Sequence, residues 1–99
     1  MAPSVDLAAL AIDDFIPHFN GTFDLHTAHG PIALRLIRAD RGGGGRPGGG
    51  FSLLFASAPG PWLSQAIYQI THPTCGTMEL FLVPIGPIEQ GNGYQAVFA

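Results

Sequence analysis

The sequence contains no lysine, and its positive charge comes from four arginines against seven acidic residues. Charged residues make up 11 % of the chain, whereas a soluble domain averages about 25 %. The net charge of −3 disfavours a general nucleic-acid-binding protein, which needs a basic surface. So few charges cannot cover a small domain, and we therefore expect some apolar surface to be exposed or to contact a partner.

Cysteine and long apolar runs are equally scarce. The single cysteine, Cys75, excludes a disulfide within the chain. The apolar runs fall far short of the roughly 20 residues that span a bilayer as a helix. No basic segment followed by an apolar one marks a signal peptide. We therefore expect a cytoplasmic protein that does not bind membranes.

Sustained helical periodicity is also missing, and most of the chain instead alternates apolar and polar residues. The expected strands are 22–27, 32–40, 51–56, 66–71, 78–83 and 94–98. Such short strands, with turn residues between them, are typical of a small antiparallel barrel or sandwich. We therefore expect an all-β fold in a single domain, with consecutive strands paired as a meander. The alternation predicts a core of Phe23, Leu25, Leu34, Leu36, Leu53, Phe55, Tyr68, Ile70, Leu80, Leu82 and Phe98.

Residues 4–19 are the best candidate for a helix. Asp13 is a candidate N-cap, Asp14 favours a helix N-terminus, and Pro17 limits the helix to about one or two turns. We expect a short helical turn that closes one end of the β structure. Trp62 follows a turn-forming segment and is expected either to cover the core or to form an exposed contact.

Residues 41–50, RGGGGRPGGG, lie between two expected strands, so a flexible hairpin loop is the simplest interpretation. A phosphate-binding loop would need a following helix and a lysine, and an RNA-binding segment would need repeated Arg-Gly-Gly units. The chain's arginines all lie on this hairpin: Arg35, Arg38, Arg41 and Arg46. They could dock an acidic neighbour, or they could simply keep the loop and its strand soluble.

Two short pairs have the spacing of metal ligands: His26 with His29, and His72 with Cys75. Together they would supply three imidazoles and a thiolate to tetrahedral zinc. The alternative is a set of turn histidines beside a small buried thiol, and we expect no metal and no other cofactor. Cys75 and His72 make a poor nucleophilic pair, because no third residue is found to orient them. With no catalytic set identified, we expect that the protein is not an enzyme.

The chain resembles a small bacterial family of domains of unknown function, DUF6916. The resemblance rests on an F-x-L-x-F strand, a Leu-x-Gln before an Ile-Tyr strand, a His-Pro turn ending in glycine, a Phe-Leu-Val-Pro run and a terminal Tyr-x-Ala-Val-Phe. In this chain these are Phe51, Leu53, Phe55, Leu63, Gln65, Ile67, Tyr68, His72, Pro73, Gly76, residues 81–84 and residues 94–98. Asp14-Phe15 and Gly21-x-Phe23 are also similar.

The resemblance implies no particular activity. It implies a structural or assembly role, because genes of this family often lie near genes for phage-tail-collar-like proteins. The position of Cys75 is usually aliphatic in the family, which implies that a metal ligand is not required there. The glycine-rich loop is variable, which favours a plain loop.

Apolar side chains on the outer face of the strands predict an interface. Unpaired backbone groups at a sheet edge are usually protected by charged residues or proline, and strand 94–98 has no charged side chain. We expect that either the barrel closes onto this strand or a neighbouring subunit pairs with it. Phe81, Val83 and Val97 are the residues expected at the interface of a homo-oligomer.

Two functions therefore remain in view. The first is a non-enzymatic structural or assembly module that self-associates or docks on phage-tail-like structural proteins. The second is a β-barrel that binds a small ligand or a metal, with an enzymatic role left open.

Overall fold

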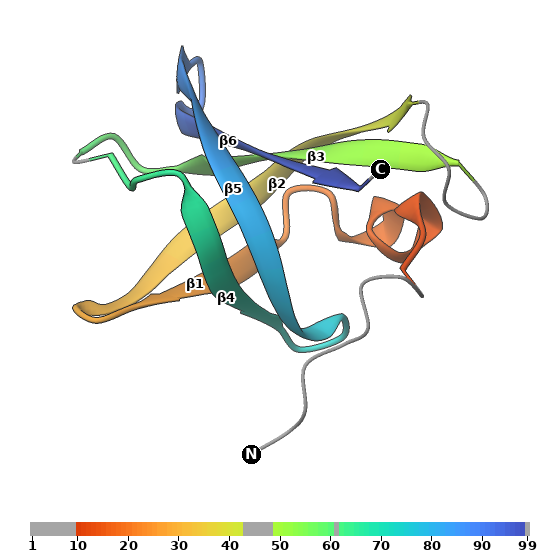
Figure 1. Cartoon of the computed structure of the whole chain (residues 1–99), viewed down its shortest axis with the longest axis horizontal. Coiled ribbons are helices and arrows are strands. Elements are labelled where there is room, and N and C mark those ends of the chain that lie inside the picture. The colour runs from red at the N-terminus through yellow and green to blue at the C-terminus, as the bar shows by residue number, and fades with distance from the viewer. Residues whose placement is uncertain (1–9, 43–48, 61, 99) are drawn as a thin grey trace.

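Six strands in the described part of the chain close into a barrel (Figure 1). The structure is a computed structural model that describes residues 10–42, 49–60 and 62–98. Each strand is antiparallel to both neighbours. The strands are β1 (Thr22–Thr27), β2 (Gly30–Gly42), β3 (Gly50–Ser57), β4 (Ala66–His72), β5 (Gly76–Ile88) and β6 (Gly91–Phe98). The predicted all-β fold is confirmed, and closure makes it a barrel. None of the described helices is long or apolar enough to cross a membrane.

The strand order around the barrel is β1-β2-β3-β6-β5-β4, with β4 pairing back to β1. The predicted meander is therefore wrong at one step, because β3 lies beside β6 and not beside β4. The connection between Ser57 and Ala66 is too long for a tight hairpin turn. The backbone N–H of Leu63, within this connection, donates to the Tyr94 hydroxyl of β6 at 2.9 Å. The connection thereby leads the chain to β4, which pairs with the free side of β1.

This order also removes the sheet edge that the sequence predicted. β6 pairs with β3 on one side and with β5 on the other. Of the two expected outcomes for the last strand, closure of the barrel is the one observed. Up to Gln95, where its ladder with β5 ends, β6 therefore has strand partners on both sides.

Two strands are longer than their composition suggests. The expected strands 78–83 and 94–98 leave the residues between them as a loop, but β5 continues to Ile88 and β6 begins at Gly91. The register of the ladder shifts between Pro84 and Gly86, where Gly86 has a φ of 110°. A Cβ on Gly93 would lie 3.1 Å from side-chain atoms of both Ile85 and Ile88. Glycine and proline therefore allow an irregular and closely packed ladder in this segment. The expectation of a loop is wrong.

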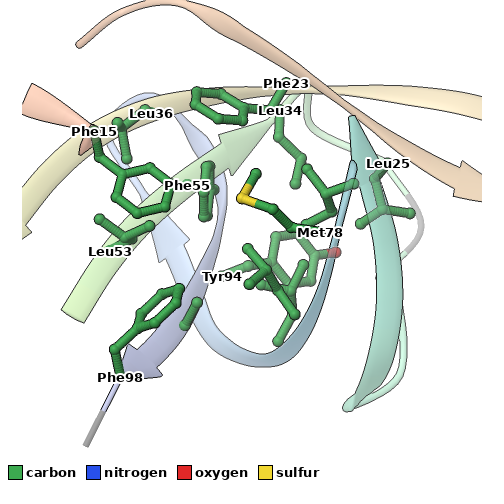
Figure 2. Packing of buried hydrophobic residues seen from close by; sticks show 14 of the residues in the cluster. Phe15, Phe23, Leu25, Leu34, Leu36, Leu53, Phe55, Met78, Tyr94 and Phe98 are labelled. Carbon is green, nitrogen blue, oxygen red and sulfur yellow. The ribbon is translucent and has the colours of Figure 1, made fainter. Parts of the chain in front are cut away.

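The interior of the barrel is filled by apolar side chains (Figure 2). Along most strands these alternate with more exposed ones. All the predicted core residues are buried except Tyr68. Tyr68 is half-buried, and its hydroxyl donates to the carbonyl oxygen of Ser64 at 2.6 Å. The predicted list missed Ile12, Phe15, Phe51, Ala56, Met78, Tyr94 and Ala96. Figure 2 shows Met78 in the middle of this core, between Phe55 and Tyr94.

One end of the barrel is closed by two short 3-10 turns, η2 (Ile12–Asp14) and η3 (Ile16–His18). Phe15, between the two turns, is fully buried. Its ring centroid lies 5.8 to 6.5 Å from the rings of Phe98, Phe51 and Phe23. The predicted helical turn that closes the barrel is thus confirmed, and we call residues 11–18 the plug. Residues 4–9 of the predicted helix lie outside the described residues.

The start of the plug differs from the prediction. Asp13 does not cap η2, because Ala11 holds the N-cap position. The Asp14 carboxylate accepts the Ala11 N–H at 2.8 Å. Asp13 instead pairs with Arg41 of β2 at 3.3 Å, with both side chains largely exposed. An exposed pair of this kind contributes little stability.

The glycine-rich segment is shorter than the predicted loop 41–50. Arg41 lies opposite Phe51 and Gly42 lies opposite Gly50, so both ends of the segment belong to the β2–β3 ladder. Residues 43–48 lie outside the described residues.

Replacing residues 43–49 by Asn-Gly is expected to leave the fold intact. A two-residue turn can connect the paired Gly42 and Gly50 directly. Shortening a connection changes the closure entropy little, so the free energy of unfolding should change by no more than about 1 kcal/mol. Urea melts followed by circular dichroism measure it. A Gly-Ser segment of the original length is the control, and a loss above about 2 kcal/mol in both variants would mean that the native residues pack or bind.

Candidate functional site

The four residues considered as candidate metal ligands, three histidines and a cysteine, are not gathered at one place. His26 Nε2 is hydrogen-bonded to Thr71 Oγ1 at 2.7 Å. His26 lies opposite Gln69 of β4, which is about 10 Å along the strand from His72. His29 is exposed in the β1–β2 turn, where its backbone N–H donates to Thr27 Oγ1 at 3.1 Å. The His26–His29 pair therefore belongs to a hairpin turn.

The other predicted pair meets a residue that the sequence did not indicate. His18 from the plug joins His72 and Cys75, and the possible ligand atoms of all three lie within 4.8 Å of one another. We call these three half-buried residues the His-Cys cluster. His72 ends β4 and Cys75 lies in the β4–β5 turn. The sequence around His18 did not indicate a possible metal ligand. His18 is far from His72 in the sequence, and that separation does not predict their distance in space.

The β4–β5 turn holds the His72 ring in one orientation. The backbone N–H groups of Thr74 and Cys75 both donate to His72 Nδ1, at 3.0 and 3.2 Å. Because a backbone N–H is only a donor, Nδ1 is an unprotonated acceptor, and the neutral ring carries its proton on Nε2. The ring also contacts Phe23 and His18, with centroids 4.4 Å away in each case. His72 is thus fixed by both hydrogen bonds and packing.

Burial favours the uncharged forms of His72 and Cys75. Desolvation, and then the charge of the neighbouring His18, lower the pKa of His72. Desolvation, and then the Asp14 carboxylate, raise the pKa of the Cys75 thiol. The Cys75 thiol also donates to the carbonyl oxygen of Asp14 at 3.7 Å. A protonated thiol is a weak nucleophile, so this arrangement does not activate Cys75 for covalent catalysis.

The cluster is open to solvent on one side. A hollow of about 320 Å³ beside it is lined by Leu10, Asp14, Thr74 and Cys75. The hollow therefore gives water or a small ion a route to the Cys75 sulfur.

A second candidate site is the outer surface of β4, β5 and β6. Ile67, Phe81 and Val97 are 66 %, 49 % and 64 % exposed. They line one groove of about 190 Å³, and Ile67 lies directly opposite Phe81 in the β4–β5 ladder. Val83, predicted with Phe81 and Val97, is half-buried. We call Ile67, Phe81, Val83 and Val97 the apolar face.

The groove exists because β5 and β6 separate. Their ladder runs from Ile88 opposite Gly91 to Val83 opposite Gln95. The groove lies beyond its last pair, between residues 79–81 of β5 and residues 96–98 of β6. Glu79 is the charged residue that borders it. The alternation in the sequence predicted that Phe81 and Val97 point outward. It did not predict where β5 and β6 separate.

A family model described as a domain of unknown function (DUF6916) matches residues 10–98. The chain belongs to this family. The resemblance in the strand motifs is thereby confirmed, and the DUF6916 match includes both the barrel and its plug. No curated protein and no solved structure matches the chain.

Two of the three described arginines of this DUF6916 domain, Arg38 and Arg41, form ion pairs within the chain, and Arg35 is exposed. Arg38 pairs with Asp40 at 2.7 Å, and Arg41 pairs with Asp13 at 3.3 Å. Arg46 lies outside the described residues. Local pairing reduces the positive field of the β2–β3 hairpin, which weakens the case for docking an acidic neighbour.

The barrel interior offers little to a small ligand. Apolar side chains occupy it, and within the described ranges no buried side-chain nitrogen or oxygen lacks a hydrogen-bond partner. A binding pocket normally combines free volume with a few convergent polar groups. Both candidate sites are accordingly on the outside of the barrel.

Proposed function

We propose that this chain is a non-enzymatic assembly module that associates through its apolar face. The occupant of this face is a second copy of the chain or, as the family resemblance suggests, a tail-like structural protein. The observation that carries the proposal is the exposure of Ile67, Phe81 and Val97 around a single groove. Soluble monomers rarely leave large apolar side chains grouped in this way.

The low charge of the chain supports the same proposal. Only 11 % of the residues are charged, and surfaces used for association are poor in charged residues at their centre. Glu79 at the border of the groove fits the polar rim of such an interface. A homodimer would use this face on both copies, because two-fold symmetry pairs a patch with itself.

The apolar face by itself supports only moderate affinity. Full burial of a valine, isoleucine or phenylalanine side chain contributes about 1.5 to 3 kcal/mol, and these residues are already partly covered. Association loses at least about 4 kcal/mol of translational and rotational free energy. We therefore expect an oligomer whose population depends on protein concentration over the micromolar range.

The double change Phe81→Ser with Val97→Lys is expected to shift the protein to monomer. It removes one apolar side chain at the groove and places a positive charge there, which has to be desolvated in any association. Light scattering and sedimentation across a dilution series measure the mass. Circular dichroism should show an unchanged β spectrum, because both side chains are on the outer surface.

The matched control is Ile16→Ser with Phe19→Lys, which changes two apolar side chains of 41 % and 43 % exposure outside the apolar face. The control should keep the mass of the unmodified protein. An unmodified protein that is monomeric at high concentration and captures no structural partner would rule out the proposal.

The alternative function, a ligand- or metal-binding barrel, retains one supporting observation. This observation is the His-Cys cluster, which is independent of the apolar face.

A further inference from the structure

We propose that His18, His72 and Cys75 form an exchangeable zinc site that joins the plug to the β4–β5 turn. Two segments that are distant in sequence, the plug and the β4–β5 turn, bring two imidazoles and one thiol within 4.8 Å of one another. These donors are the ones that zinc prefers in proteins. The cluster lies outside the apolar face, so the zinc site does not depend on the proposed assembly function.

The spacing of the three donors is close to that of a zinc site. Zinc lies about 2.0 Å from histidine nitrogen and about 2.3 Å from cysteine sulfur. Tetrahedral ligands at these distances are separated by roughly 3.5 Å. The cluster, with atoms within 4.8 Å, therefore needs side-chain movements of only about 1 Å, which half-buried residues can make. The fourth position faces the hollow beside Cys75 and suits a water molecule.

The β4–β5 turn prepares two of the ligands. His72 and Cys75 have the two-residue separation found in zinc-binding pairs. The hydrogen bonds from the Thr74 and Cys75 N–H groups to His72 Nδ1 keep the turn compact. Both ligands therefore face His18 on the plug before any metal arrives.

The same hydrogen bonds limit the affinity. Since His72 Nδ1 already accepts two N–H groups, zinc has to displace either these bonds or the proton on Nε2. In sites of high affinity the remote nitrogen of the histidine instead donates a hydrogen bond, which strengthens the ligand. We therefore expect half-occupancy at micromolar zinc, and ready removal by a chelator.

Binding releases at least one proton. The bond between zinc and the Cys75 sulfur forms as the thiol loses its proton to solvent and its hydrogen bond to the Asp14 carbonyl. The ionisable groups around this sulfur are Asp14, His18 and His72. An ordinary cysteine thiol, with a pKa of about 8.5, is protonated at pH 7. The affinity should therefore rise at least about tenfold per pH unit near neutrality.

Cobalt(II) titration followed by zinc competition tests the site. The expected result is one metal ion per chain, with the thiolate-to-cobalt absorption that only a sulfur ligand produces. Zinc at a hundredfold excess over its dissociation constant should raise the melting temperature by the order of 10 °C, because it binds only the folded chain. Cys75→Ser should abolish the thiolate absorption and weaken zinc binding at least tenfold.

Two histidine variants complete the test. His18→Ala should also weaken zinc binding at least tenfold, whereas His29→Ala, an exposed histidine outside the cluster, should have no effect. Metal-free melts show whether each variant is folded, and His18→Gln keeps a side chain of similar size if His18→Ala is not. The proposal is wrong if the folded protein gives no thiolate absorption at millimolar cobalt, or if His29→Ala weakens binding as much as His18→Ala.

Discussion

Replacing Phe55 with alanine is expected to lower the free energy of unfolding by about 3 to 5 kcal/mol. Phe55 is fully buried on β3, and its ring packs edge-on against Phe23 with centroids 5.4 Å apart. The substitution loses the transfer free energy of the ring and leaves a cavity, because a closed barrel cannot collapse around the missing side chain. A domain of this size has only about 5 to 15 kcal/mol of stability, so the variant should be close to unfolding.

Urea melts of the purified variant measure this loss. The control is Phe19→Ala, which makes the same chemical change at a side chain that is 43 % exposed. It should lose clearly less stability, since part of its ring remains in contact with water. A loss below about 1 kcal/mol for Phe55→Ala would be incompatible with a core position.

Gly91→Ala is expected to be at least as damaging, for a different reason. Gly91 begins β6 with a φ of 136°, and a Cβ there would lie 2.0 Å from the carbonyl oxygen of Ser57. That atom belongs to the β3 backbone, which is paired with β6 and cannot move aside independently. We expect a loss of more than about 3 kcal/mol, or a chain that does not fold.

Gly86→Ala separates the two causes of this loss. Gly86 has a φ of 110°, but a Cβ there would meet nothing within 4 Å. It should lose only the cost of the unusual dihedral angle, about 1 to 3 kcal/mol. Thermal melts of the two variants therefore measure the backbone contact as a difference. Equal losses in both would show that the approach of Gly91 to Ser57 is not important.

The alternation of apolar residues was enough to predict the strands and most of the core. Phe23 and Leu25 are separated by an exposed aspartate, as are Leu34 and Leu36 by an exposed arginine, and all four apolar side chains are buried. This works because side chains of a strand point alternately to its two faces. The same period correctly directed Phe81 and Val97 outward.

Composition gave a wrong prediction for residues 86–93, where glycine and proline lie within a β ladder. This segment is rich in residues that favour turns, yet most of it belongs to β5 and β6. Gly93 packs under Ile85 and Ile88, and Gly91 approaches Ser57. A local pattern cannot distinguish a glycine that makes a turn from one that allows a close backbone approach.

By itself, the sequence determined the fold class, the family motifs and the side chains that face inward, because all three depend on local residue order. Only the tertiary structure showed that β3 pairs with β6. The residue pattern of a strand shows which side chains face inward, but it does not show which other strand lies beside it. The tertiary structure also decided both candidate sites. The groove depends on where β5 leaves β6, and the His-Cys cluster depends on the packing of the plug, which brings His18 to His72 and Cys75 across the end of the barrel.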